Sequence, residues 1–546
     1  RIIVLIIAAL LPLTSLLAIR PPLQTLSLSP ALPKYRILLV PLDSRPPCTQ
    51  FVSQLGELAE TEIILPPTQL LDNYNRPAKQ AELRQWLADN ISSVDAAILS
   101  SDMLIHGGLI ASRHSIGNDN DVRATIDLLR EIHLRYPDTP LYVFSIIPRL
   151  LLADSPADSP WQTPIMQYSI VKHQSAIFDN PVDFNRVAEW EDVIPPEIIA
   201  RYKNLYAQNV IINKNLIDLT KENTIHSLIL GQDDGYPFGL PNQSANDLRH
   251  YADRKLLHER DRVIITRGAD EVALTMLGQY ITGTVRKHRP QIFVAWSDPS
   301  LQSLIMPFMP HSAYSTVEEK IKIIGGDIVD SPDQADFILF LHLGTIRTHE
   351  QHLKSAAITV NNFIKQGHHV AVIDLSEDYF SSETLLPYLI SENVDLTKLA
   401  AYAGWNTSSN SIGTAVTQAA LFTGTINLLH ETSLPGFRNS QLNFLISRFV
   451  DDWYFQKEVQ GQVNSSLRKH HINPYHLQTN HNLAIAQINR RLEDRTQSFF
   501  RRSLRGKEFS VGNDTYVLTA LEIDCRLPWD RTFEIEVTPL LRYNKK

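Results

Sequence analysis

Two adjacent carboxylates close an apolar run near the middle of the chain. In the stretch HSLILGQDDGYPFGLPN (226–242), the segment LIL has the pattern of a buried strand, and Asp233 and Asp234 end it. On a regular strand the two side chains would point to opposite faces, but Gly235 and the Tyr-Pro turn let the backbone bend, so that both reach one side. Neighbouring like charges raise the pKa of one carboxyl group, which is what an acid catalyst needs. We therefore predict that the pair is catalytic.

Other aspartates stand at the same place in their segments. Asp43, Asp102, Asp270 and Asp298 each lie just past the apolar part of a strand-like run. The carboxyl ends of parallel strands share one rim, where α/β proteins bind ligands. A single aspartate after a strand commonly caps the next helix. Several acids on one rim instead predict a ligand-binding site.

Residues around these acids are candidates for binding a substrate. Gly107 and Gly108 permit close backbone approach. Arg45 in DSRPP is suited to clamp a carboxylate or phosphate, or to neutralise a rim acid such as Asp43. The indole of Trp405 is suited to stack on a sugar face, although GWNTSSN also has the turn-forming residues of a strand end. The predicted substrate-binding residues are Asp43, Arg45, Asp102, His106, Arg113, Asp270, Glu271, Trp405, Asn406 and Asn410.

Short apolar runs of strand length alternate with longer helix-patterned segments from residue 34 onward. Seven such runs precede residue 300: RILLV, EIIL, DAAIL, LYVFSII, SLIL, RVIIT and QIFVAW. Continuous apolar strands alternating with helices indicate a parallel sheet covered on both faces, so the predicted class is α/β. With an eighth strand still to be assigned, seven units favour a complete or distorted (β/α) barrel over an open sheet.

The chain divides into four predicted regions. Residues 1–33 begin with RIIVLIIAALLPLTSLLAIRPP, which has the basic start and apolar run of a signal peptide or uncleaved N-terminal anchor, followed by a linker, and predicts export. Residues 34–315 form the barrel-like domain, and 316–430 form a second α/β unit that is flavodoxin-like or continues the first. Residues 431–546 are helical and end in an alternating, antiparallel β unit.

Composition narrows the class of partner. The 546 residues are 43% hydrophobic and 20% charged, which is typical of a globular chain with two or three domains. A net charge of -8, with no basic cluster beyond RRSLR (501–505), argues against nucleic-acid binding. Cys48 and Cys525 are too few for a zinc site or a disulfide framework, although a single bridge stays open. The sequence has no HExxH, Walker or GxGxxG motif, so we expect no cofactor. We expect a small-molecule or glycan substrate. Contact with a membrane is expected only through an N-terminal anchor.

Six blocks spread along the chain carry a family resemblance. They are VPLDSRPP (40–47), SSDMLIHGGLIASR (100–113), GQDDGYPFG (231–239), RGADEVALTML (267–277), AGWNTSSNSIG (403–413) and LPWDRTFE (527–534). Together they resemble the signature blocks of a bacterial family named domain of unknown function 4127. This resemblance extends over nearly all of the chain after the N-terminal segment, but it implies no activity.

The acid pair has a local resemblance of its own. An Asp-Asp dipeptide at a strand end is similar to the catalytic pair of glycoside hydrolases that act on N-acetylhexosaminides by substrate assistance, the class that includes glycoside hydrolase family 84. The resemblance implies that Asp233 steadies the 2-acetamido group while Asp234 protonates the leaving oxygen. We therefore expect an exported glycoside hydrolase acting on N-acetylhexosamine-containing glycans.

Two other functions stay open at this point. Carboxylates such as Asp43, Asp102, Asp233 and Asp270 would suit Mg²⁺, Ca²⁺ or Mn²⁺ in a metal-dependent hydrolase. A non-catalytic, exported carbohydrate-binding protein is the other alternative.

Overall fold

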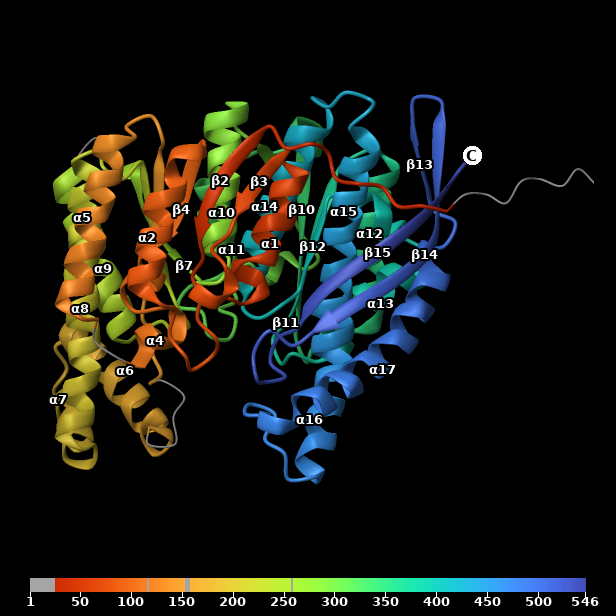
Figure 1. The fold of residues 1–546 in the computed structure, drawn as a ribbon. Coiled ribbons are helices and arrows are strands. Elements are labelled where there is room, and N and C mark those ends of the chain that lie inside the picture. The colour runs from red at the N-terminus through yellow and green to blue at the C-terminus, as the bar shows by residue number, and fades with distance from the viewer. Residues whose placement is uncertain (1–24, 115–116, 153–157, 257–258) are drawn as a thin grey trace, which may run out of the picture.

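Two parallel sheets and one small antiparallel sheet organise the chain (Figure 1). The computed structural model describes residues 25–114, 117–152, 158–256 and 259–546. The predicted signal peptide or anchor falls mainly on residues 1–24, outside the described residues. Within the described ranges, no helix has both the length and the apolar character needed to cross a membrane.

The first sheet is open and has six parallel strands in the order β3-β2-β4-β5-β6-β7. The strands are β2 (Tyr35–Val40), β3 (Thr61–Ile64), β4 (Ala96–Ser100), β5 (Leu141–Ile147), β6 (Ser227–Gln232) and β7 (Val263–Arg267). The predicted (β/α) barrel is wrong. A barrel adds each strand beside the previous one until the last meets the first, whereas here β4 pairs with β2 on the side away from β3, which leaves β3 and β7 as edges.

The second sheet has five parallel strands in the order β12-β11-β10-β8-β9. They are β8 (Gln291–Trp296), β9 (Asp327–Ile328), β10 (Phe337–Gly344), β11 (Val370–Ser376) and β12 (Ala401–Ala403). The run QIFVAW, placed by the sequence analysis in the first unit, is β8 and pairs with β10. In chain order this sheet reads 2-1-3-4-5 from its β9 edge, which is the flavodoxin-like order of doubly wound sheets. The first sheet has the same order with a sixth strand added.

Helices cover the faces of both sheets. Those before residue 290 are α1 (Gln50–Leu58), α2 (Gln80–Asn90), α3 (Ser101–Ile105), α4 (Leu109–His114), α5 (Asp119–Arg135), α6 (Gln162–Phe178), α7 (Pro181–Val193), α8 (Pro196–Lys221), α9 (Leu240–Leu256) and α10 (Val272–Gln279). Those that follow are α11 (Ala313–Ile323), α12 (Glu350–Lys365), α13 (Leu386–Ser391), α14 (Ser408–Ile426), α15 (Leu434–Arg448), the π-helical segment η11 (Phe449–Val459), α16 (Gln460–Lys469) and α17 (His481–Phe499).

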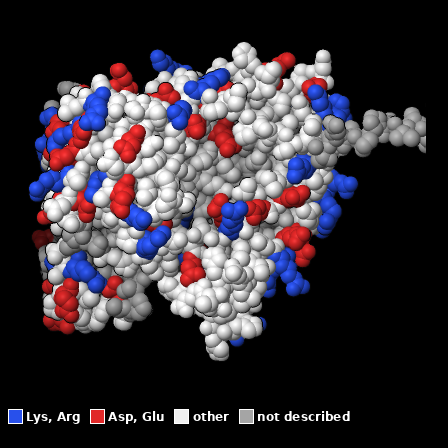
Figure 2. Space-filling view, in the orientation of Figure 1, with Lys and Arg blue, Asp and Glu red and all other residues white. Residues whose placement is uncertain are grey.

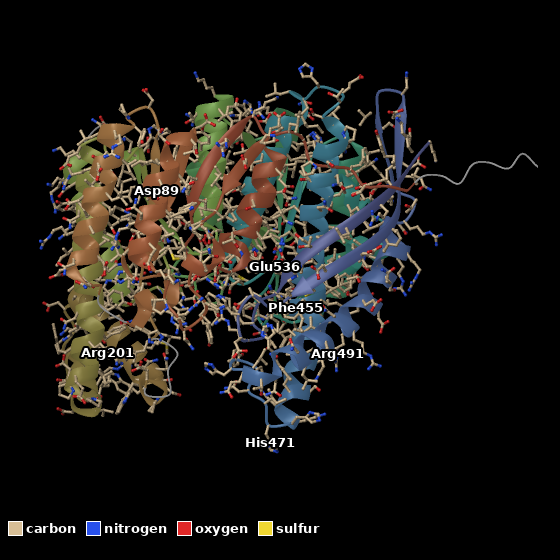
Figure 3. All side chains as sticks on the ribbon, in the orientation of Figure 1. Asp89, Arg201, Phe455, His471, Arg491 and Glu536 are labelled. Atoms are coloured by element: carbon tan, nitrogen blue, oxygen red, sulfur yellow. The ribbon has the colours of Figure 1, made fainter. Side chains whose placement is uncertain are left out.

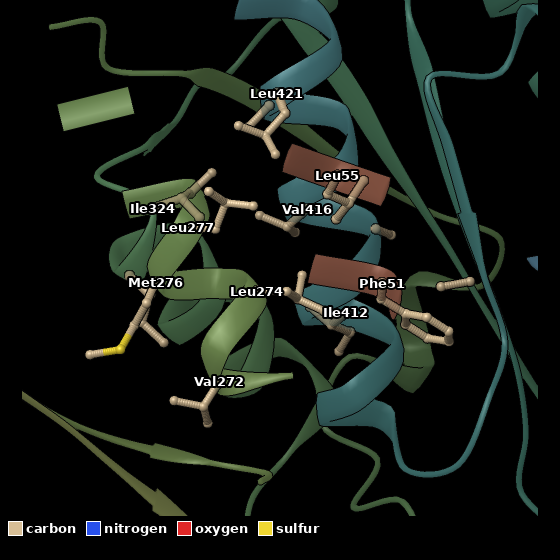
Figure 4. Packing of buried hydrophobic residues seen from close by; sticks show 14 of the residues in the cluster. Phe51, Leu55, Val272, Leu274, Met276, Leu277, Ile324, Ile412, Val416 and Leu421 are labelled. Atoms are coloured by element: carbon tan, nitrogen blue, oxygen red, sulfur yellow. The ribbon is translucent and has the colours of Figure 1, made fainter. Parts of the chain in front are cut away.

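A layer of helices shared by both sheets forms the centre of the molecule. Figure 4 shows Phe51 of α1, Leu274 of α10 and Ile412 of α14 packed together. The same apolar cluster contains Leu39 of β2 and Leu339 of β10, which belong to different sheets. Burial of apolar surface stabilises by about 25 cal/mol per Å², so this common core fixes the two sheets to each other.

The C-terminal region confirms the predicted helices followed by a small antiparallel sheet. After α15 to α17, strands β13 (Glu508–Val511), β14 (Asp514–Arg526) and β15 (Glu536–Lys545) pair antiparallel, and β1 (Thr25–Leu26) joins β15. The side chain of Gln50 on α1 donates a hydrogen bond to the carbonyl of Val537, 3.0 Å away, so this sheet is anchored to the shared layer.

The lower side of the molecule in Figure 1 has two projecting lobes. Arg201, on α8, lies in one lobe, and His471, in the turn after α16, lies at the tip of the other (Figure 3). The space-filling view has a notch between the lobes and shows charged residues of both signs mixed over this face (Figure 2). Because α4 and α6 follow β4 and β5 and lie low in Figure 1, the carboxyl ends of the first sheet point toward this side.

One buried ion pair joins the end of the first sheet to helices of the second. The Nζ of Lys320 on α11 lies 2.7 Å from Oε1 of Glu271, which immediately precedes α10, and neither side chain is exposed. Lys320 also donates to the carbonyl of Arg267 at the end of β7. Ser409 of α14 donates to Glu271 Oε1 at 2.8 Å. Burial lowers the pKa of Lys320, and Glu271 partly offsets this.

We expect Lys320→Met to lower the free energy of unfolding by about 3 to 5 kcal/mol, because it leaves the Glu271 carboxylate buried without a cation. The double variant Lys320→Met/Glu271→Gln should recover part of this loss, since it removes both charges. Denaturant unfolding measures the free energy of unfolding of both variants. Lys322→Met is the matched control, because Lys322 pairs with Asp261 at the exposed surface of the same helix and should change stability by less than about 0.5 kcal/mol. Equal stability of wild type and Lys320→Met would contradict a stabilising role for the ion pair between Lys320 and Glu271.

Candidate functional site

The carboxyl ends of the two sheets meet at one polar region. Asp270 follows β7 of the first sheet, and Asn406 follows β12 of the second. The amide nitrogen of Asn406 lies 3.5 Å from Asp270 Oδ2. A second contact joins the loops, since the backbone N–H of Gly235, after β6, donates to the carbonyl of Phe308 at 2.9 Å. Loops of both sheets therefore contribute to this region.

A single guanidinium joins two of the predicted rim acids. Arg45 Nη2 lies 2.6 Å from Asp43 Oδ2 and 2.6 Å from Asp270 Oδ1, and all three side chains are buried. Burial lowers the pKa of Arg45, but the charges of Asp270 and Asp43 outweigh it and raise the pKa above its usual value. Burial raises the pKa of Asp270 to about 6, with Arg45 opposing. Arg45 therefore neutralises the rim acids, one of the two roles that the sequence left open.

The DSRPP segment explains why Arg45 points this way. The Arg45 backbone N–H donates to Asp43 Oδ1 at 3.0 Å, which makes an Asx-type turn. Pro46 then restricts Arg45 to an extended conformation (φ -70°, ψ 155°), which ends the turn before the helical turn Pro46–Cys48. Trp529 from the C-terminal region covers the other side, with its ring centroid 5.1 Å from the guanidinium carbon.

A second arginine holds the first member of the acid pair. Arg113 Nε, on α4, donates to Asp233 Oδ2 at 2.9 Å. Gly107 and Gly108 precede α4 with φ of 87° and 120°, and a Cβ on Gly108 would lie 3.1 Å from the Asp72 carboxylate, so these glycines allow the turn that presents Arg113. Burial raises the pKa of Asp233, but Arg113 and Arg149 outweigh it and hold the pKa below its usual value.

The second member of the pair has the opposite electrostatic environment. Burial, and then the negative charge of Asp233, raise the pKa of Asp234 to about 7. The Asp234 backbone N–H donates to Asp233 Oδ1 at 2.9 Å, so the two carboxyl groups are held in one turn. Asp233 is buried, whereas Asp234 is partly exposed. The two neighbours therefore differ in protonation near neutral pH.

Loops of both sheets near Asp234 carry exposed aromatic side chains. Partial burial and the nearby Asp234 and Tyr236 raise the pKa of Tyr379, after β11, to about 12. Tyr236, Phe308, Tyr379 and the adjacent Phe380 are 38%, 36%, 41% and 58% exposed. We call these four residues the aromatic rim. Phe308 and Tyr379 also have left-handed φ of 62° and 61°, a conformation that is costly for bulky residues and concentrates at functional sites.

Two predicted binding residues lie nearby but face other groups. Asp102, on α3, accepts a hydrogen bond from the backbone N–H of Ile146 at 2.9 Å, and burial raises its pKa to about 7. It interacts electrostatically with Asp233 but is itself buried. His106 lies against Gly117, and its charged neighbour is Asp121 on α5. Burial lowers its pKa to about 4. Asp102 thus joins α3 to β5, and His106 belongs to the α3–α5 packing.

Three further predicted binding residues have structural contacts. Trp405 is buried, donates from Nε1 to Thr414 at 3.3 Å, and packs edge-on against Phe51, so it offers no face to a sugar. Glu271 is enclosed in its ion pair with Lys320. Asn410 is buried and donates to Glu271 Oε2 at 2.9 Å. These predictions are corrected because packing across elements directs all three side chains into the shared core.

Asp298, the fifth acid past a strand, is also separate from the site. It follows β8 in the second sheet and accepts from the backbone N–H of Ser300 at 2.9 Å, which is the helix-capping role that the sequence analysis gave as the structural explanation.

Asp43, Cys48 and Asp270 are close enough to hold a metal ion, with ligand atoms within 4.8 Å of one another. Arg45 already occupies the space between the two carboxylates. Burial also raises the pKa of the Cys48 thiol, which opposes the thiolate that a metal requires. A divalent ion would have to displace the guanidinium to bind here.

Sequence reasoning missed Trp529 and the aromatic rim. Trp529 donates from Nε1 to the hydroxyl of Ser44 at 2.8 Å and covers Arg45. The block LPWDRTFE (527–534) was the available signal, because it stood among the family blocks without an assigned role. The residues of the rim come from three separate loops, and no spacing pattern relates those loops.

Fold and site together define an α/β protein with two parallel sheets whose strand ends share a carboxylate and arginine centre. The chain belongs to the family described as "Protein of unknown function (DUF4127)", whose model matches residues 37–538. A search of curated proteins found no match.

Two solved structures show weak similarity. One is a C2-type ketoreductase from a modular polyketide synthase, with 11% identity, 78% of this chain and 79% of that chain covered, and a TM-score of 0.20. The other is GanP, a glucose-galactose binding protein from Geobacillus stearothermophilus, with 10% identity and a TM-score of 0.14. The match covers 71% of this chain and 89% of that chain. Neither similarity is strong enough to support an argument about this chain.

The raised pKa of Asp102 predicts a pH-dependent stability. A carboxyl group whose pKa rises from an unfolded value near 3.9 to about 7 stabilises the fold below pH ~4, and this contribution is lost as pH rises through 7. We expect Asp102→Asn, which keeps an acceptor for Ile146, to be more stable than wild type at pH 8 by on the order of 3 kcal/mol, and to differ little at pH 4. Denaturant unfolding at both pH values measures this. An equal difference at pH 4 and pH 8 would contradict a buried, titrating Asp102.

Proposed function

We propose that the protein is an exported glycoside hydrolase acting on N-acetylhexosamine-containing glycans by substrate-assisted catalysis. Asp234 is the general acid and Asp233 is the carboxylate that orients the 2-acetamido group. The observation that carries the proposal is the divergence of the two pKa values, lowered for Asp233 and raised to about 7 for Asp234. Adjacent titratable groups whose environments separate their pKa values are suited to opposite roles in acid and base chemistry.

The charge states suit the two roles. In the first step the acetamido oxygen attacks the anomeric carbon, the glycosidic C–O bond breaks, and the Asp234 proton goes to the leaving oxygen. Asp233 stays ionised. Arg113 uses Oδ2 and the Asp234 backbone N–H uses one lone pair of Oδ1, so the second lone pair of Oδ1 accepts from the acetamido N–H. In the second step Asp234 takes a proton from the water that opens the cyclic intermediate.

The aromatic rim supports a sugar as the substrate. Ligand sites typically combine aromatic walls with a few polar groups that fix orientation. Here Tyr379 lies close to both Asp234 and Tyr236, and Asn406 beside Asp270 offers polar groups for hydroxyls. In this proposal the rim takes the stacking role that the sequence analysis assigned to Trp405.

A metal-dependent hydrolase is the alternative that uses the same region. It would need Asp43 and Asp270 as ligands, and Arg45 holds both. A carbohydrate-binding protein without catalysis is the other alternative, and it would use the aromatic rim without proton transfer at Asp234.

Chromogenic N-acetylhexosaminides with good and poor leaving groups test the assignment. We expect Asp234→Asn to lose about 10² to 10⁴-fold in kcat/KM on the poor leaving group and much less on the good one, because only the former needs protonation. Asp233→Asn should lose activity on both alike. Asp298→Asn is the matched control, since that aspartate caps a turn of the second sheet, and it should keep wild-type activity.

The same assay separates the alternatives. Chelator should leave the hydrolase active, and full activity in both Asp233→Asn and Asp234→Asn would refute the glycosidase mechanism. Chelator sensitivity would favour the metal-dependent hydrolase, and saturable glycan binding without turnover would favour the binding protein.

The pKa of Asp234 predicts the pH profile of this activity. An acid catalyst must carry its proton, so kcat/KM should fall as pH rises above about 7. Because the negative charge of Asp233 contributes to that raised pKa, Asp233→Asn should move the falling limb to lower pH. If the falling limb of the pH profile stays in place in Asp233→Asn, or moves to higher pH, the result would contradict the assignment of Asp234 as the acid.

A further inference from the structure

A serine and a histidine form a hydrogen-bonded pair at the carboxyl ends of two neighbouring strands in the second sheet, apart from Asp233 and Asp234. Ser297 directly follows β8, and its Oγ lies 2.9 Å from Nδ1 of His342 on β10. β8 and β10 are neighbours where the order of this sheet reverses. Doubly wound sheets bind ligands at the carboxyl ends of the strands at this reversal.

The hydrogen bonds determine the tautomer of His342. Its Nε2 lies 2.7 Å from the carbonyl oxygen of Glu383. A carbonyl only accepts, so Nε2 carries the proton and Nδ1 has the lone pair that accepts from the Ser297 hydroxyl. Burial lowers the pKa of His342, which keeps the ring neutral and able to take a proton. This is the hydrogen-bonding pattern of a nucleophile, a base and a group that orients the base.

The orienting carbonyl is held in place by close packing. A Cβ on Gly344, at the end of β10, would lie 2.0 Å from the Glu383 carbonyl oxygen, so only glycine allows this approach. The Glu383 side chain also accepts from the Ser376 hydroxyl at 2.6 Å. His342 is fully buried, whereas Ser297 is partly exposed. A buried base is therefore hydrogen-bonded to the hydroxyl of a partly exposed residue.

The helix after β10 supplies groups that favour negative charge. His352, in the first turn of α12, interacts electrostatically with both His342 and Asp298. Its Nε2 is buried and has no hydrogen-bond partner within the part of the chain that the structure describes. The residue before α12, His349, makes no side-chain cap. The positive N-terminal end of this helix and the imidazole of His352 suit a developing oxyanion.

We propose that Ser297 and His342 form a second reactive centre, in which Ser297 is the nucleophile for carboxylic esters. The Ser297 proton passes to His342 Nδ1 as Oγ bonds to the ester carbonyl carbon. The C–O bond of the ester then breaks, and the proton on Nδ1 goes to the leaving alkoxide. A water molecule attacks the acyl-serine, gives its proton to Nδ1, and releases the acid as Oγ recovers a proton.

A fluorophosphonate probe tests this centre on the full chain. Oγ displaces fluoride from phosphorus, and His342 takes the hydroxyl proton. We expect one adduct per chain by intact mass, located at Ser297 by peptide mass spectrometry, and none in Ser297→Ala. Ser300→Ala is the matched control, because that more exposed serine donates to Asp298 Oδ1 at 2.7 Å and should label at the wild-type rate.

Turnover of p-nitrophenyl acetate gives the second readout. Ser297→Ala should reduce it by at least about 10²-fold. The variant should stay folded with only a small decrease in melting temperature, because the buried Nδ1 of His342 loses its hydrogen-bond donor. The proposal is overturned by an absent adduct, by an adduct at another residue, or by Ser297→Ala hydrolysing the ester at the wild-type rate.

Discussion

One guanidinium group holds together the acidic centre on which the site depends. Arg45 lies in the loop after β2, and Asp270 lies in the loop after β7, which is the far edge strand of the same sheet. Without the cation, Asp43 and Asp270 would be two buried like charges, which a protein interior does not tolerate unpaired. Trp529 covers the guanidinium, so the C-terminal region contributes to the same arrangement.

The second constraint is the core that the two sheets share. Helices α1, α10 and α14 pack between them, and residues such as Phe51 and Ile412 belong to one apolar cluster with strands of both sheets. Domains joined by a small polar interface move relative to each other, whereas a large apolar interface opposes such motion. The two sets of strand ends are therefore held in a fixed relation, and Asp270 and Asn406 can meet across them.

The two sheets have the same strand order but use their reversal points differently. In the first sheet the reversal lies between β2 and β4, where Asp43 pairs with Arg45 and Asp102 is bound to the backbone of β5. In the second sheet the reversal carries the Ser297 and His342 pair. The partly exposed acid Asp234 lies away from both reversals, at the end of β6, where a loop of the second sheet reaches it.

The sequence by itself determined the local features of this protein. Apolar runs followed by acids predicted parallel strands with polar ends, and Asp233 with Asp234, Arg113 and Arg45 were all recognised as candidates for one site. These signals are local, because strand pattern, turn residues and side-chain chemistry depend on a few neighbouring positions.

Only the tertiary structure decided how the strands pair and where several side chains point. Hydrogen bonding between distant segments placed β8 beside β10 and left the first sheet open. Contacts with Phe51 of α1 and Thr414 of α14 turned Trp405 inward, so that its ring is buried. The physical reason is that burial and ion pairing depend on which segments meet in space, and residues far apart in sequence, such as Asp43 and Asp270, meet only in the folded chain.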